Sequence, residues 1–376
     1  MRLAANSAGD NTQDDLRANA GIALERSLAY LAKSQSNDGG WHSKTYGQLK
    51  GGAALTTFVL DALSHAPEEW RKKHAEAIAR GYEFLRAGFV RRGTIACPDG
   101  SLDHPTYGAA LWLLSRRRLG LAGEEQARTD LLNYLLGAQC AKGRGFEQEN
   151  SSFGGWDFLG QRDAHGVTTG TNVSVTCLVL EALAEELRRE PNIKQAREIQ
   201  TALRHAIVWT GHCQQKDGGF CFTPEPMSLN NKADFKDDAR REPRAYGTAT
   251  CDGIRALLAC GVQADDKRVT KAAAWLAERP SLELVPGFEG LPPELGWQRG
   301  LRFYYYASLA KVLPTLPPAD VASRRKSLLE MLLKLQRTDG SFLNESDRMR
   351  ENDPLIATGL ALAALATSSN RDVPKG

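Results

Sequence analysis

The sequence lacks several features that would assign it to a common class at once. Its 376 residues contain no Cys-x-x-Cys pair, and the seven cysteines are an odd number spread along the chain. This pattern is typical of reduced thiols in a cytosol-like compartment rather than of a disulfide framework. The start, Met1 to Asn6, lacks the long apolar stretch of a secretory leader, so we expect a cytoplasmic location.

Excess charge and long apolar runs are also missing. The 48 basic and 45 acidic residues leave a net charge of +3, so nothing marks a nucleic-acid partner. No run approaches the ~18 apolar residues of a membrane span. The glycine pairs at 39–40, 154–155 and 218–219 lack the Gly-x4-Gly-Lys-Ser/Thr order of a phosphate loop. The basic run Arg116 to Arg118 is expected to be solvated at a helix end, with phosphate binding as the minor alternative.

What the chain does contain is a repeated pattern around a glutamine and a glycine. Four segments carry it: Leu31-x3-Gln35-x3-Gly39-x-Trp41, Leu135-x3-Gln139-x3-Gly143, Gln214-x3-Gly218-x-Phe220 and Leu332-x3-Gln336-x3-Gly340-x-Phe342. Aspartate precedes the glycine in three of them. Each segment follows one apolar helical run and precedes another, which indicates a series of similar structural units.

The apolar spacing divides the chain into six helix–loop–helix units. In each unit the first helix is amphipathic, whereas the second is apolar nearly all round and should be buried. The first unit covers about residues 16–64. The others pair helices at 75–89 with 107–114, 130–139 with 171–187, 195–212 with 247–259, 268–277 with 301–313, and 321–335 with 354–365.

Six such units can close into one ring, in which inner helices form a barrel and outer helices cover it. We therefore predict an all-α fold, an α/α toroid of six helical hairpins, as one domain over residues 16–368. Length alone would suggest about two or three domains. Residues 1–15 and 369–376 are expected to be flexible. Tetratricopeptide repeats are excluded, because their units have about 34 residues and these have about 50 to 70.

The Leu-x3-Gln-x3-Gly-x-aromatic pattern resembles the QW repeat of squalene and terpene cyclases. The six-unit arrangement is similar to the toroid that those cyclases share with protein prenyltransferase β subunits. The segments 246–250, 302–306 and 345–348 also look like a bacterial branch of prenyltransferase and squalene-oxidase repeat proteins. This resemblance covers nearly the whole chain and implies an apolar isoprenoid ligand.

The chain departs from the known reactions of these families. A class II cyclase protonates its substrate with the central acid of an Asp-x-Asp-Asp-Thr-Ala segment. The most similar stretch here, residues 249–254, keeps only the last aspartate, Asp252, and has Cys251 in the place of the donor. A thiol is far too weak an acid for that step. Those cyclases also carry two helical barrels, and this chain supplies one.

The metal site of a protein prenyltransferase is also missing. That site needs an Asp-x-Cys pair and a later histidine. Residues 246–258 contain no Asp-x-Cys, and residues 354–365 contain no histidine. The thioester toroids need Cys-Gly-Glu-Gln, but the Gly-Glu-Glu-Gln at 123–126 lacks the cysteine. We therefore expect neither a metal nor a cofactor.

Asp252 is the carboxylate that the pattern places early in an apolar inner helix, where the barrel should open. Desolvation there would raise its pKa and allow it to act as a catalytic acid. The alternative is a structural carboxylate paired with an arginine. Aromatic side chains stabilise cations, and the tyrosines expected to bind substrate near Asp252 are Tyr107, Tyr246, Tyr304 and Tyr305. Consecutive helical residues cannot all face one side, so some of these belong to the core.

Other candidate residues carry weaker signals. Asp61 and Glu181 lie further along their helices and look less well placed. Asp353 precedes Pro354 and is expected to cap the last inner helix. His104 and the Asp163-x-His165 motif show no ligand spacing for a metal.

Two functions remain open from the sequence. The first is a protein that binds, and cyclises or isomerises, an isoprenoid in its barrel. The second is a non-catalytic toroid that binds a protein or a glycan through its loop face, for which the long loops at 140–171 and 222–246 argue. A deep apolar cavity would favour the first, and a plugged barrel with a polar groove would favour the second.

Overall fold

A computed structural model of the chain describes residues 4–91, 93–95, 104–160, 170–189, 191–225, 232–236, 242–292, 294 and 296–369. The side chains of residues 4–14 and 91 are not described. The expected loop at 97–101, Asp163 and His165 lie outside the described residues. Within them the regular structure is helical, apart from two isolated β-bridges and one antiparallel pair of two-residue strands, β1 (Val90–Arg91) and β2 (Thr94–Ile95).

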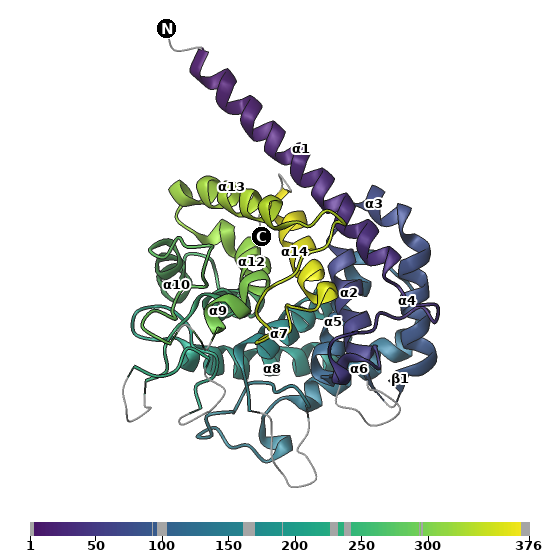
Figure 1. Cartoon of the computed structure of the whole chain (residues 1–376). Helices are drawn as coiled ribbons and strands as arrows, with labels where there is room; N and C mark the ends of the chain where they lie inside the picture. The colour runs from purple at the N-terminus through teal and green to yellow at the C-terminus, as the bar shows by residue number, and fades with distance from the viewer. Residues whose placement is uncertain are drawn as a thin grey trace.

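Six inner helices form a closed ring (Figure 1). Each contacts the next along the chain, and the last contacts the first, so the ring has no open end. They are α2 (Ala53–Ser64), α5 (Pro105–Leu119), α7 (Val173–Leu187), α9 (Gly247–Ala259), α12 (Arg302–Val312) and α14 (Pro354–Ser369). The prediction of an all-α toroid is confirmed.

The outer helices cover this ring. They are α1 (Ala4–Lys33), α4 (Ala75–Gly88), α6 (Glu125–Ala138), α8 (Ile193–Cys213), α10 (Lys267–Ala277) and α13 (Pro318–Leu335). Short elements complete the described fold: η1 (Gly47–Leu49), α3 (Glu68–Lys73), η2 (Lys142–Arg144), α11 (Trp297–Gly300) and η4 (Leu313–Thr315). Inner α9 buries eleven of its thirteen residues, whereas outer α10 buries only a stripe of five, as their apolar patterns require.

The repeated glutamines tie each unit to its neighbour. Gln35 Nε2 donates to the Gly39 carbonyl in its own loop (2.7 Å) and to the Ala77 carbonyl of α4 in the next unit (2.8 Å). Gln336 makes the equivalent bonds to Gly340 and to Ala23 of α1 (2.7 Å). Its second bond therefore joins the last unit to the first and closes the ring.

The second repeat has its loop glycine at another position than the spacing predicts. Gln139 Nε2 donates to the carbonyls of Gly154 and Ala202 (both 2.9 Å), so Gly154 is the structural equivalent of Gly39. Gly154 has φ +95°, and a Cβ there would lie 2.4 Å from the His205 carbonyl oxygen. Gly143 lies in η2 with no atom near its missing Cβ. The assignment of Gly143 to the pattern is wrong, because a loop insertion separates the glutamine from its glycine.

Helix α1 begins earlier than the sequence analysis places it. Residues 4–15 are helical, although we expected them to precede the first helix and to be flexible. The helix extends beyond the body of the molecule (Figure 1). The segment contains no proline, and a helix already anchored at its packed half extends at little cost per residue.

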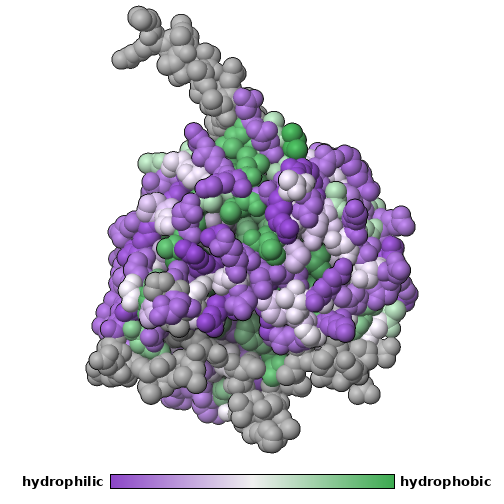
Figure 2. Space-filling view, viewed as in Figure 1, coloured by the Kyte–Doolittle hydropathy of each residue, from purple (hydrophilic) through white to green (hydrophobic). Residues whose placement is uncertain are grey.

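The face of the ring seen in Figure 2 is largely hydrophilic. Figure 2 shows one face, on which a hydrophobic strip follows α14 and the adjoining part of α1. Within the described part of the chain, no helix combines the length and apolarity that a membrane span requires.

Candidate functional site

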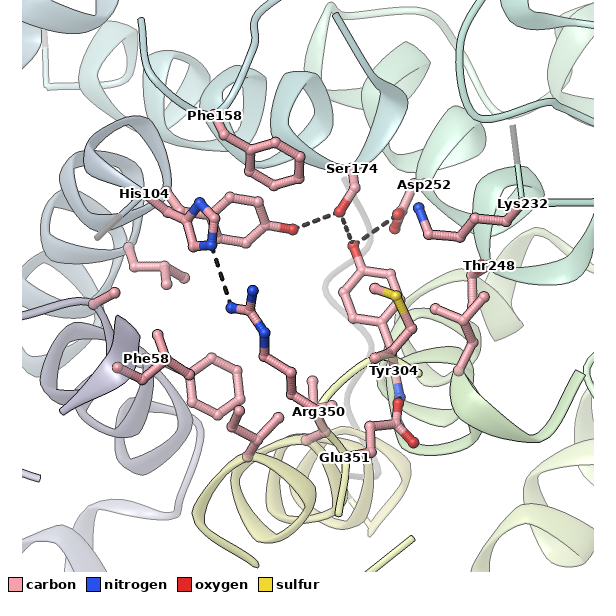
Figure 3. Close-up of a pocket in the computed structure, with 18 of the residues that line it drawn as sticks. Phe58, His104, Phe158, Ser174, Lys232, Thr248, Asp252, Tyr304, Arg350 and Glu351 are labelled. Carbon is pink, nitrogen blue, oxygen red and sulfur yellow. Dashed lines mark hydrogen bonds between the residues drawn. The ribbon is translucent and has the colours of Figure 1, made fainter. Parts of the chain in front are cut away.

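The barrel contains a mostly apolar cavity of about 210 Å³ at the N-terminal ends of the inner helices (Figure 3). All six inner helices contribute to its wall, mostly with residues of their first two turns. A small set of polar groups in an apolar wall is the usual form of a ligand site. The lining from these helices comprises Ala54, Leu55, Phe58, Tyr107, Leu111, Ser174, Thr248, Asp252, Tyr304, Ile356 and Leu360.

Asp252 is a buried carboxylate of this wall. Its Oδ1 accepts hydrogen bonds from Arg255 Nη1 (2.7 Å) and Ser308 Oγ (3.0 Å), and its Oδ2 accepts one from the Tyr304 hydroxyl (2.7 Å). Burial raises the pKa of Asp252, while Arg255 and the two hydroxyls oppose the shift. Asp252 therefore lines the cavity, as its place in the helix predicts, and it is also paired with an arginine, as the alternative interpretation predicts.

A chain of hydroxyl groups leads from Asp252 across the cavity. Tyr304 contacts Ser174 Oγ (2.7 Å), and Ser174 in turn contacts the hydroxyl of Tyr107 (2.5 Å). Burial raises the pKa of Tyr107 to about 12 and that of Tyr304 well above its usual value. At neutral pH these tyrosines are protonated, so the chain can pass a proton only by concerted donation and acceptance.

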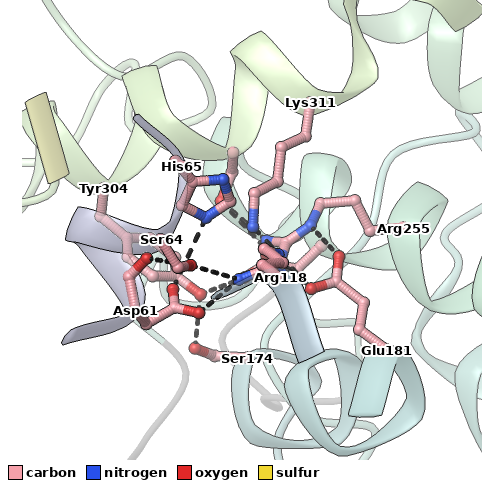
Figure 4. A network of polar contacts seen from close by, with 11 residues as sticks. Asp61, Ser64, His65, Arg118, Ser174, Glu181, Arg255, Tyr304 and Lys311 are labelled. Atoms are coloured by element: carbon pink, nitrogen blue, oxygen red, sulfur yellow. Dashed lines mark hydrogen bonds and ion pairs between the residues drawn. The ribbon is translucent and has the colours of Figure 1, made fainter. Parts of the chain in front are cut away.

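A charged network forms the floor beneath this chain (Figure 4). Arg255 donates to both carboxylate oxygens of Glu181 (2.8 and 2.9 Å), and Lys311 lies 3.8 Å from the same carboxylate. Arg118 pairs with Asp61. Burial raises the pKa of Glu181, but Arg255 and Lys311 outweigh it and bring it to about 2.

The prediction that the run Arg116 to Arg118 is solvated is revised for two of its members. Arg118 does not solvate the end of α5, because its guanidinium turns inward to Asp61. Its neighbour Arg116 is buried as well and donates to the carbonyls of Ala122 (3.0 Å) and Gly123 (2.9 Å) beyond the helix end. Arg117 is exposed, as the prediction requires, whereas Arg116 and Arg118 bond acceptors within the fold.

Two cationic side chains, Lys232 and Arg350, reach the cavity from loops. The Lys232 ammonium lies 3.1 Å from the centroid of the Phe222 ring, and burial lowers its pKa to about 7 while the charge of Asp252 opposes the shift. Arg350 Nη1 lies 3.4 Å from His104 Nε2, and Figure 3 shows its guanidinium extending into the cavity. Neither cation forms an ion pair with a carboxylate of the described residues.

Glu351 and Asp353 hold the N-terminal ends of two inner helices. Glu351 accepts from the backbone N–H groups of Phe303 (3.0 Å) and Tyr304 (2.9 Å) at the start of α12, and burial raises its pKa to about 7. Asp353 Oδ1 accepts from Leu355 N (2.9 Å), so the predicted cap of α14 is confirmed.

The cavity brings together most of the predicted site residues. Asp252, Tyr107, Tyr246 and Tyr304 all line it. Tyr305 does not: its buried ring lies behind the wall, against the position where Gly247 lacks a Cβ. One residue of separation turns a helical side chain by about 100°, which places Tyr305 away from Tyr304.

Sequence reasoning missed Ser174, Lys232 and Arg350. Ser174 follows the Asn172 cap of α7, a signal that places it one turn from the barrel mouth. Arg350 has the left-handed φ of +62°, which a sequence pattern does not reveal. Cys251, in the place of the cyclase acid, is fully buried outside the cavity lining, and burial raises the pKa of its thiol well above the usual value. Among the described residues, no three histidine, cysteine, aspartate or glutamate side chains cluster as metal ligands would.

Solved structures share this fold over nearly their whole length. A variant of the type II terpene cyclase MstE from Scytonema in complex with merosterolic acid A matches with a TM-score of 0.61 at 15% identity, over 94% of this chain and 98% of that chain. Another variant, with geranylgeranyl dihydroxybenzoate, matches at 0.60 and 15% with the same coverage. A glycosidase in complex with glucose matches at 0.59 and 14%, over 94% and 97%.

The family comparison agrees with the ring of helices. None of the curated proteins compared with the chain matches it significantly. The model of the prenyltransferase alpha-alpha toroid domain matches residues 59–296 and 193–373, which together span most of the sequence. The chain belongs to the prenyltransferase alpha-alpha toroid domain family.

Proposed function

We propose that this chain is a cyclase-like toroid that binds an isoprenoid in the barrel cavity and rearranges it by proton transfer at Asp252. The observation that carries the proposal is a buried carboxylate facing a mostly apolar cavity whose wall includes aromatic rings. Apolar rings accommodate the chain of the ligand and stabilise a cation formed on it. The terpene cyclases of this fold include one solved with geranylgeranyl dihydroxybenzoate, its substrate.

The chemistry requires one proton and returns it. The carboxyl of Asp252 adds its proton to a carbon–carbon double bond of the ligand and leaves a carbocation. The carboxylate then takes a proton from a carbon next to the cation, either directly or after ring closure. The product is an isomer of the substrate, so the cycle needs neither an oxidant nor a reductant. Burial supports this role because it favours the protonated form of Asp252.

Binding is tested by filling the cavity. Ala54 of α2 lines it, and Ala54→Trp should abolish retention of farnesol or squalene in a solvent extract analysed by mass spectrometry. Ala75→Trp, at an exposed position of α4, is the matched control and should retain the ligand. Thermal unfolding of both variants establishes that they fold. Equal retention by the two variants would show that the ligand lies elsewhere.

Catalysis is tested by removing the proton. Asp252→Asn should abolish product formation from a bound isoprenoid while binding persists, because an amide cannot deliver the proton. Unchanged turnover in this variant would remove Asp252 from the mechanism. A wild-type extract without any isoprenoid, and no conversion of those supplied, would instead favour the protein- or glycan-binding function of the loop face.

A further inference from the structure

The cavity carries positive charge that the described carboxylates do not balance. Lys232 is stabilised by the Phe222 ring, and Arg350 is flanked by His104 and the Gln48 amide. Asp252, the carboxylate that accepts from the Tyr304 hydroxyl, is already paired with Arg255. A partly buried cation without a counter-ion is costly in free energy, so an anion that enters this cavity gains more than it would in water.

The surrounding backbone adds to this preference. The six inner helices direct their N-terminal ends toward the cavity, and each end carries a partial positive charge. Glu351, which covers the start of α12, is the other acidic group of the wall and is bonded by neutral N–H donors. The field within the cavity is therefore positive on the side where Arg350 enters, while the remaining wall is apolar.

Arg350 has an unfavourable backbone conformation, which the hydrogen bonds of the surrounding turn maintain. Its φ of +62° is rare for a residue with a long side chain and is unfavourable in free energy. The turn is fixed by Arg350 N donating to the Asp347 carbonyl (3.1 Å) and by Asp353 N donating to the Arg350 carbonyl (2.9 Å). This geometry directs the guanidinium into the cavity, as Figure 3 shows.

From these features we infer that the ligand is a short apolar monocarboxylic acid, with its carboxylate on Arg350 and Lys232 and its tail among the rings of Phe58, Tyr107 and Phe158. The inference rests on the proposed function, because it concerns the ligand of the same cavity. A guanidinium binds a carboxylate through two parallel hydrogen bonds. The volume of about 210 Å³ lies below the ~300–1,000 Å³ of common ligand sites, which favours a short isoprenoid tail over squalene.

A diphosphate head fits the same cavity less well. It carries up to three negative charges, whereas the described wall offers the Arg350 guanidinium and a lysine that is only partly charged at neutral pH, and it also contains Asp252 and Glu351. The additional charge would be left without a partner near two acidic groups. A single carboxylate balances the arginine and leaves the lysine as a second donor.

The experiment compares four ligands with tails of ten carbons by isothermal titration calorimetry on the full chain. Geranic acid should bind at least about tenfold more tightly than geraniol or geranyl diphosphate, as a charge-assisted pair predicts. Arg350→Met should remove most of that preference, and Lys232→Met should reduce it, without weakening geraniol. Decanoic acid tests the tail, since it has the same head and no isoprenoid double bonds.

The control variants are Arg348→Met and Lys236→Met, which remove exposed cations near each site residue and should leave geranic acid binding unchanged. Equal binding of acid and alcohol, or tighter binding of the diphosphate, would overturn the carboxylate inference and leave the isoprenoid proposal standing. Tighter binding of decanoic acid would keep the head group and contradict the isoprenoid tail. Binding of none of the four ligands would contradict both proposals.

Discussion

Glu181 and Glu351 are both glutamates of the barrel interior, yet their pKa values are shifted in opposite directions. Glu181 in the floor is bonded by Arg255, which keeps its pKa near 2, whereas Glu351 at the cavity is bonded by neutral N–H groups and has a pKa of about 7. In the floor each carboxylate has a cationic partner within the fold. In the cavity, Lys232 and Arg350 have no carboxylate partner among the described residues, so a ligand can supply the anion that they lack.

The largest effect should follow from breaking the floor. Arg255→Met leaves Glu181 and Asp252 enclosed without their main counter-ion, so we expect a loss of about 3–5 kcal/mol in the free energy of unfolding. Urea denaturation measures it. Arg188→Met removes an exposed pair with Glu185 and should change stability by less than about 1 kcal/mol. Similar losses in both variants would show that the floor is not held by its charges.

The pH dependence of stability should separate the two glutamates. The folded pKa of Glu351 lies above its unfolded value of 4.5, so its proton is held more tightly in the folded state. Its contribution is complete below about pH 4.5 and is lost as the pH rises to about 7, a decrease on the order of 3 kcal/mol. Glu181 has the opposite sign, because its stabilisation is lost as the pH falls from about 4.5 toward about 2.

The Glu351→Gln variant should therefore lack the decline between about pH 4.5 and about pH 7 that urea denaturation shows for the wild type. Glu76→Gln, at an exposed position of α4, should follow the wild-type curve. A decline of equal size in Glu351→Gln would assign the effect to another group and end the contrast with Glu181.

The stability of the loops that join the outer and inner helices, called the frame below, should depend on backbone geometry rather than on charge. Gly154→Ala places a Cβ 2.4 Å from the His205 carbonyl oxygen at φ +95°, and we expect a loss of at least about 2 kcal/mol. Gly143→Ala, with open space around the new Cβ, should change stability by less than about 1 kcal/mol. Thermal unfolding of both variants gives the comparison, and the reverse order would restore Gly143 to the repeat.

The smallest effect should come from opening the ring at its seam. Gln336→Ala removes the hydrogen bond to Ala23 in the first unit, and we expect a loss of about 1–2 kcal/mol without a change in ligand binding. Gln126→Ala removes an exposed bond to Asp130 within one helix and should cost less than about 0.5 kcal/mol. A seam variant that binds ligand more weakly than the wild type would show that frame and cavity are coupled.

The frame was predictable because each of its loops depends on neighbours in the sequence. A glutamine, an aspartate and a glycine within a few residues specify the turn, and the apolar period specifies the helices on either side. The exception is Gly143, where the expected spacing occurs by chance and an insertion moves the working glycine to Gly154.

The cavity was only partly predictable because its polar residues are distant in the sequence and come together only when the ring closes. The position of Asp252 early in an apolar helix predicted that it lies at the opening of the barrel. The helical period predicted that Tyr304 and Tyr305 cannot both face the cavity. Arg350 and Lys232 enter from loops that no helical pattern describes. The inward turn of Arg118 depends on Asp61, which lies on a different helix and is distant in the sequence.

The most direct test of the isoprenoid cavity is mass spectrometry of a solvent extract from the purified chain after incubation with an equimolar mixture of geraniol, farnesol and squalene. We predict that the wild type retains or converts one of the shorter isoprenoids, and that Ala54→Trp retains none. Equal, empty extracts from both proteins would contradict the account and turn attention to the loop face.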